Sequence, residues 1–213
     1  MGYEETLAAF RRGDNAEAAR LARTDLDQAA AEGDMAGQVD ALCMLARVVL
    51  RQGHIAEVDS LAMQAQDVAD ESPDRRLQRM PIHLRAVAAR MAGRHDEARR
   101  LYLRSIELNL ELDEPRMVAA EHRNLAYVEI RAGDLPRARE LFAQARQLLS
   151  GLDHQTLAPY LIFDEATEAY LAGDYAGASA KLGDADRAFT ELALVPDPDD
   201  AVEIAELRRR LHS

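Results

Sequence analysis

The sequence has a single cysteine, a single lysine (Lys181) and only 5% aromatic residues. Because Cys43 has no second cysteine to pair with, an internal disulfide is excluded and a reducing compartment is favoured. No apolar run approaches the length of a membrane span, and residues 1–14 carry acids where a signal peptide would need an apolar stretch. We therefore expect a cytoplasmic protein that does not contact a membrane.

Motifs that carry catalysis or cofactor binding are also missing. The sequence contains no HExxH, no GxSxG and no glycine-rich loop that could cradle a phosphate. His83 and His122 could form a two-histidine site, but no third metal ligand can be named, and Cys43 has no partner base at a recognisable spacing. We expect no catalytic, cofactor or metal site and no enzymatic activity. An enzyme built on a repeat scaffold is the alternative.

What the sequence does contain is a repeated pattern centred on five glycines. Each lies 40 residues after the one before: Gly13, Gly53, Gly93, Gly133 and Gly173. A small residue follows each glycine by five positions (Ala18, Val58, Ala98, Ala138, Ala178), and another precedes it by seven (Thr6, Ala46, Ala86, Ala126, Ala166). The last three copies add a bulky residue, Tyr102, Phe142 or Leu182, where the first two have Ala22 and Ala62. A strict period over five copies predicts a stacked helical array.

The copy at residues 121–145 shows the expected unit most clearly. Apolar residues follow a helical period on both sides of the turn at Gly133, where a helix end favours a residue that accepts positive φ. Asp134 then stands at an N-cap position, and Pro136 fits the first turn of the next helix. The pattern predicts a helix, a short turn and a second helix.

At these positions the chain resembles the tetratricopeptide repeat family. The family's pattern of Ala, x-x-G-D-Y/L-x-x-A, aromatic and Ala is matched best at Ala126–Ala145 and Ala166–Ala185. Each unit is about six residues longer than the usual 34, and the proline that usually ends the second helix is missing. The longer units resemble those of kinesin light chains, bacterial peptide-pheromone receptors and some large transcriptional activators. The resemblance implies an all-α, right-handed α-solenoid of five helix-turn-helix repeats plus a C-terminal capping helix.

We expect one repeat domain over residues 1–213. The repeats are placed at about 1–34, 35–74, 75–114, 115–154 and 155–194, and the capping helix at about 199–211. Pro81 and Pro159 fall where a long first helix is expected, so each either begins its helix or kinks it.

In relatives of this family, the first helix of each repeat supplies the concave groove. Transferring those positions predicts a partner-binding set of arginines, aromatics and one histidine: Arg47, Arg51, His83, Arg90, Arg123, Tyr127, Arg131, Tyr160, Phe163 and Tyr170. This basic groove contrasts with the net charge of −12 for the whole chain. Arginine offers a planar fork for carboxylates, and aromatic rings add rigid apolar contact. For Arg51 and Arg131 a structural alternative stays open, because the helix dipole favours a cation in the last turn by about 0.3–1 kcal/mol.

From this groove we predict a non-enzymatic scaffold for protein–protein interaction. It would bind a peptide segment of acidic or carboxylate-bearing character, and we expect Arg47, Arg90 and Arg123 to form an exposed row of cations. The alternative is a regulatory repeat protein that senses a peptide or small ligand and acts on a transcription factor or kinase. The acidic net charge argues against direct nucleic-acid binding, and a homodimer is possible. A chaperone-tail clamp is rejected, because only Asn124 fits its pattern while Leu84 and Asp164 do not.

Overall fold

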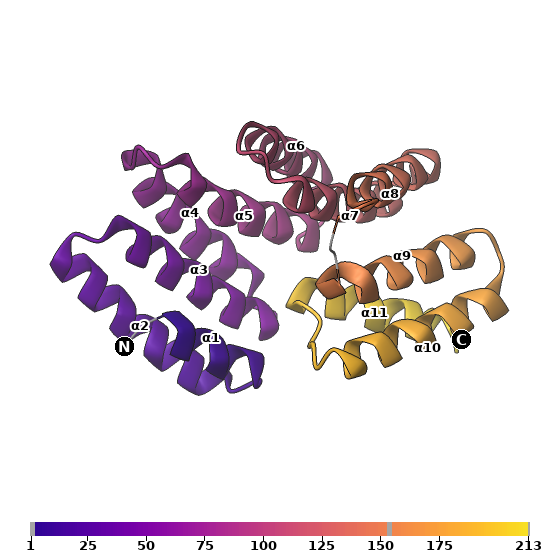
Figure 1. Ribbon diagram of the computed structural model, residues 1–213, viewed down its shortest axis with the longest axis horizontal. Coiled ribbons are helices and arrows are strands. Elements are labelled where there is room, and N and C mark those ends of the chain that lie inside the picture. Colours follow the sequence, from indigo (N-terminus) through magenta and orange to yellow (C-terminus); the bar gives the residue numbers. More distant parts are fainter. Residues whose placement is uncertain (1–2, 153–154, 213) are drawn as a thin grey trace. The chain divides into compact units, whose positions relative to one another are not determined.

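The computed structural model describes residues 3–152 and 155–212 (Figure 1), and within them the chain is built of α-helices joined by short turns. The helices are α1 (Tyr3–Arg11), α2 (Asn15–Glu32), α3 (Met35–Arg51), α4 (Ile55–Glu71), α5 (Arg79–Met91), α6 (His95–Glu111), α7 (Pro115–Ala132), α8 (Leu135–Leu149), α9 (Ala158–Leu171), α10 (Tyr175–Glu191) and α11 (Pro198–Leu211). Two 3-10 helices, η1 (Arg75–Gln78) and η2 (Gln155–Leu157), precede α5 and α9. These described ranges hold no strand, so the all-α class is confirmed.

The chain divides into two compact units, Met1–Asp113 and Glu114–Ser213. Unit 1 contains α1 to α6, and there α3 contacts both α1 and α5 as well as its neighbours in sequence. Unit 2 contains α7 to α11, with α7 packed on α8 and α9 on α10. The division falls between the repeats expected at 75–114 and 115–154. A single repeat domain over residues 1–213 stays a prediction.

The turns at the five periodic glycines have the predicted backbone geometry. All five glycines have φ between +73° and +86°, a region that residues with a Cβ adopt only at a cost. At the turn between α7 and α8, Gly133 has φ +86°, and the Asp134 carboxylate caps α8 by accepting a 3.1 Å hydrogen bond from the backbone N–H of Arg137. The glycine ends one helix and the aspartate starts the next, as the sequence pattern indicated.

The two problematic prolines lie at the beginnings of their helices and cause no kink. Pro81 is the third residue of α5, and Pro159 is the second residue of α9. Both occupy the first turn, where a backbone N–H has no intrahelical acceptor and its loss therefore costs nothing. The 3-10 helices η1 and η2 take up the preceding residues.

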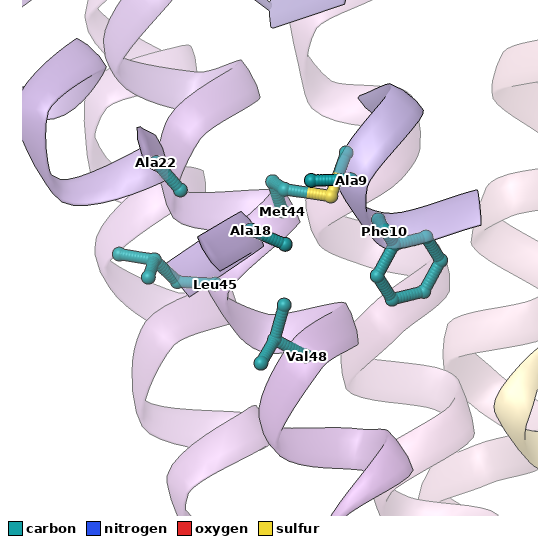
Figure 2. Packing of buried hydrophobic residues seen from close by; sticks show 7 residues of the cluster. All are labelled: Ala9, Phe10, Ala18, Ala22, Met44, Leu45 and Val48. Carbon is teal, nitrogen blue, oxygen red and sulfur yellow. The ribbon is translucent and has the colours of Figure 1, made fainter. Parts of the chain in front are cut away.

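The small residues of the repeat pattern are buried in the helix pairs. Those five positions after and seven positions before the periodic glycines are all at most 1% exposed. Figure 2 shows the corresponding core of α1, α2 and α3, made of Ala9, Phe10, Ala18, Ala22, Met44, Leu45 and Val48. Alanines on α2 leave room for the larger side chains of α3, so the helices approach closely.

Enlarging one of these alanines is expected to destabilise unit 2. Ala126 on α7 is fully buried, and Ala126→Leu should lower the free energy of unfolding by about 1–3 kcal/mol through overpacking. The matched control is Ala143→Leu on α8, where the side chain is exposed and the added atoms meet solvent. Urea denaturation of both variants measures the difference. Equal stabilities would show that Ala126 is not a close-packing position.

Candidate functional site

In unit 1, two of the predicted groove arginines hold the first repeat together. Arg51 on α3 donates hydrogen bonds of 2.9 Å to the backbone oxygen of Phe10 and 3.0 Å to the side-chain oxygen of Asn15. Its guanidinium carbon lies 3.7 Å from the centre of the Phe10 ring, and that of Arg47 lies 4.6 Å from it. Both arginines are half-buried. Arg51 therefore ties α3 to the end of α1, and Arg47 covers the same ring by a cation–π contact.

The other two predicted residues of unit 1 lie on α5. Arg90 is 1% exposed, so its guanidinium lies within the packed unit. His83 is half-buried, and its ring meets the edge of Tyr102 at a centroid distance of 6.4 Å. In unit 1, Arg47, Arg51 and His83 keep part of their side chains at the surface.

In unit 2, Arg123 forms a buried ion pair with an acid of the neighbouring first helix. Its Nε donates to Asp164 Oδ2 at 2.5 Å and its Nη2 to Asp164 Oδ1 at 2.9 Å. The hydroxyl of Tyr127 donates to the same carboxylate at 2.9 Å. Burial alone would lower the pKa of Arg123, but the carboxylates of Asp164 and Asp200 raise it well above its ordinary value. The guanidinium therefore stays charged, and the pair joins α7 to α9.

Aromatic rings surround this ion pair. Tyr127 stacks on Phe163 at a centroid distance of 5.9 Å, and Phe142 meets its ring edge-on at 5.4 Å. Tyr160 lies 5.1 Å from the Arg123 guanidinium carbon and packs edge-on against Phe189 at 5.0 Å. Burial raises the pKa values of Tyr127 and Tyr160, with Asp164 and Asp197 adding to the respective shifts, so both phenols stay neutral.

The C-terminal helix α11 lies against these residues with its acidic end. Arg123 Nη2 lies 3.4 Å from Asp200 Oδ1, and Arg131 donates from Nη2 and Nε to Glu203 Oε1 at 2.9 and 3.2 Å. The backbone N–H of Asp197 donates to the Tyr160 hydroxyl at 3.3 Å. We call Arg123, Arg131 and Tyr160 the seat of α11. This seat holds an acidic helix through charge-assisted hydrogen bonds beside an aromatic ring.

The sequence of α11 explains why this segment is helical, with acids at its N-terminal end and arginines at its C-terminal end. Pro198 occupies its first turn, acids follow at Asp199 and Asp200, and its last turn carries three arginines, Arg208 to Arg210. Acids near the N-terminus and cations near the C-terminus both match the helix dipole. Ile204 and Leu207 are buried on one face. The helix predicted at about 199–211 is thus present at Pro198–Leu211.

The expectation of an exposed row of cations is wrong. Arg90 and Arg123 are only 1% and 2% exposed, whereas Arg47 is half-buried. Side chains at the positions expected to face a groove also face the first helix of the next repeat. For Arg123 on α7, that helix is α9, which carries Asp164. Of the predicted aromatics, Tyr127, Tyr160 and Phe163 are buried, while Tyr170 is half-buried and lies 5.3 Å from the ring of Tyr175. As partner-binding residues, the ten positions stay predictions.

Three acids of this site were missed by the sequence analysis. Asp164 had a visible signal, because it interrupts the apolar face of a first helix and follows Arg123 by 41 residues, nearly one repeat. Asp200 and Glu203 had no comparable signal, because they lie after the last of the five repeats. The periodic pattern indicated the arginines and aromatic residues but not the acids that pair with them.

The described residues include no cluster of metal-binding side chains, and their one cysteine is buried. Within residues 3–152 and 155–212, no group of three or more histidine, cysteine, aspartate or glutamate side chains could hold a metal ion. Cys43 is buried, and burial raises the pKa of its thiol, which makes the thiolate harder to form. Among the same residues, no helix has the length and apolar character needed to cross a membrane.

Solved structures resemble this chain over almost its whole length. A Rap protein complexed with competence and sporulation factor matches with a TM-score of 0.76 and 17% identity, covering 97% of this chain and 56% of that protein. BtubC from P. vanneervenii matches with a TM-score of 0.61, 20% identity and coverages of 99% and 82%. The apo form of RapI matches with a TM-score of 0.64, 13% identity and coverages of 99% and 58%. The chain thus spans less than two thirds of the length of either Rap protein.

No protein-family model matches the sequence, and a comparison with curated proteins finds no match. At identities of 13–20%, the structural likeness carries the fold alone. The 40-residue form of the tetratricopeptide motif stays a prediction. The chain has the all-α fold of TPR-like helical-repeat proteins.

Proposed function

We propose that this chain is a non-enzymatic scaffold that binds an acidic or carboxylate-bearing segment of a protein partner. The observation that carries the proposal is the seat in unit 2, where basic and aromatic residues of first helices hold the acidic N-terminal end of a helix of the same chain. The side chains therefore have the chemistry and spacing to bind such a segment. The Rap structure with competence and sporulation factor adds support, because a protein of similar fold binds a factor.

Five of the ten predicted residues can contact a partner without unfolding the chain. Arg47, Arg51, His83 and Tyr170 are half-buried, and the Arg131 side chain is 37% exposed. We assign partner contact to these five. Of the buried members of the set, Tyr127 positions its neighbours, whereas Arg123 and Tyr160 reach the acidic end of α11 as part of the seat. Ion pairs between carboxylates of the partner and partly exposed arginines of this chain should weaken as the salt concentration rises. Such charges are screened over about 8 Å at physiological ionic strength.

Charge reversal at one partly exposed arginine of each unit, Arg47 in unit 1 and Arg131 in unit 2, tests this proposal. The wild-type chain should capture acidic peptides from an array of 15-residue segments, and Arg47→Glu or Arg131→Glu should reduce that capture at least about tenfold, because each replaces an attraction by a repulsion. The control is Arg137→Glu on α8, which makes the same charge change where an exposed arginine pairs with Glu140.

Helicity measured by circular dichroism should be the same in all variants. The proposal fails if the array shows no preference for acidic segments, or if both reversals bind them as well as the wild type does.

A further inference from the structure

The helix α11 has the chemical character that the proposed partner segment would need. Its N-terminal half carries three buried acids, Asp199, Asp200 and Glu203, and its buried face adds Ile204 and Leu207. Two of the acids face the seat arginines. We propose that α11 is an internal occupant of the seat and that an acidic amphipathic helix of a partner protein binds there by displacing it. This inference rests on the proposed function and adds its regulation.

The seat keeps its charge balance when α11 leaves. Arg123 donates two hydrogen bonds to the Asp164 carboxylate, at 2.5 and 2.9 Å, whereas its contact with Asp200 is longer, at 3.4 Å. The second cation, Arg131, is already partly exposed. Removing α11 therefore leaves no buried guanidinium without a carboxylate, which would otherwise be costly. The seat is organised before any acidic helix arrives.

The connection between α10 and α11 favours release. Leu192 and Val195 are exposed in this connection, and Ala193 has a positive φ of 50°, which is uncommon for a residue with a Cβ. Beyond the seat, α11 is held by the buried side chains of Ile204 and Leu207 and by an exposed pair between Arg208 and Asp186. The exposed pair contributes little, so the apolar contacts are what a partner helix would have to replace. Because the short connection to α10 tethers α11, this helix is present at the seat at an effective concentration of about millimolar. A partner helix must compete against that concentration.

The test uses the full chain and a synthetic peptide of residues 196–211 as the partner-like probe. Weakening the internal helix by Asp200→Asn with Glu203→Gln should tighten binding of the labelled peptide about tenfold, because the seat is free in a larger fraction of molecules. The matched control, Asp184→Asn with Glu191→Gln, removes the same charges from α10, where Glu191 is exposed and the Asp184 side chain is 45% exposed, and it should bind the peptide as the wild type does. Fluorescence anisotropy measures each affinity.

A second measurement reports displacement in the wild-type chain and does not depend on the folding of a variant. Hydrogen exchange should become faster in the α11 amides when excess peptide is added, while α7 to α10 keep their protection. Peptide carrying the same two amide substitutions should not produce this change. Unchanged protection of α11 at saturating peptide overturns the proposal.

The outcomes separate this inference from the proposed function. If wild type and the weakened variant bind the peptide equally and α11 stays protected, acidic segments bind elsewhere, so the scaffold function stands and the displacement fails. If neither protein binds this peptide or any acidic segment of the array, both fail. If Arg131→Glu binds the peptide as tightly as wild type, the seat is not the binding site. A dimer formed with exchanged α11 helices, detected by light scattering, would make a second copy the occupant and would also overturn the proposal.

Discussion

Replacement of Asp164 by alanine is expected to lower the free energy of unfolding by about 3–5 kcal/mol, because it leaves the Arg123 guanidinium buried without its principal counter-ion. The carboxylate of Asp164 accepts two hydrogen bonds from Arg123 and one from Tyr127, and the two charged side chains are almost fully enclosed. The melting temperature and the urea midpoint should both fall.

The neighbouring residue provides a matched control. Glu165→Ala also removes a carboxylate from α9 that pairs with a cation, Lys181, but both of those side chains reach solvent. We expect its free energy of unfolding to change little, since solvent screens the pair and hydrates the remaining charge. Similar losses in the two variants would show that burial of the Arg123–Asp164 pair does not matter to stability.

Replacing both partners distinguishes a buried-charge effect from a packing effect. The double variant Arg123→Met with Asp164→Leu removes the ion pair but keeps apolar volume, and it should recover most of the stability that Asp164→Ala loses. A double variant as unstable as the single one would indicate that the hydrogen bonds themselves, and not the unpaired charge, carry the effect.

Removal of residues 201–213 is expected to give the second large effect. The truncation takes away the buried side chains of Ile204 and Leu207, each worth about 1.5–3 kcal/mol of apolar burial. The cost of ordering α11 offsets part of this. For a unit of this size, each kcal/mol lost lowers the melting temperature by about 4–8 °C. Phe189, now buried, would become more exposed, so light scattering should also detect association.

Leu192, which follows the last residue of α10, is 40% exposed with α11 in place, so α11 covers little of it. Its contribution to the truncation effect should therefore be small. Adding the peptide of residues 196–211 should restore part of the lost melting temperature in proportion to its occupancy. A truncated chain that stays monomeric and equally stable would show that α11 does not cover unit 2.

These two experiments probe different roles of one region. The Arg123–Asp164 pair joins α7 to α9 and includes no residue of α11, so its loss should destabilise unit 2 whether or not α11 is docked. The loss of α11 should be partly reversible by an acidic peptide. This contrast separates the permanent core of unit 2 from the segment that we propose to be exchangeable.

The periodic features of the fold could be read from the sequence alone. Glycines 40 residues apart predicted five turns, and the small residues on either side of each turn predicted the closest helix contacts. Gly133, Asp134 and Pro136 placed the end of one helix and the start of the next. These features are local, because backbone conformation and helical phase depend on residues within one or two turns. Local rules therefore sufficed for the elements and for their buried faces.

Which charged side chains meet was decided by the tertiary structure. The sequence placed Arg123 on the inner face of its helix, but not within reach of Asp164, 41 residues later, or of Asp200, 77 residues later. Such pairings depend on how two helices are offset along their axes, and the hydrophobic period leaves that offset open because many offsets bury the same apolar stripe. The sequence by itself thus determined the helices, turns and close-packing positions. Only the packed structure decided that the predicted groove of α7 holds a buried ion pair and the acidic end of α11.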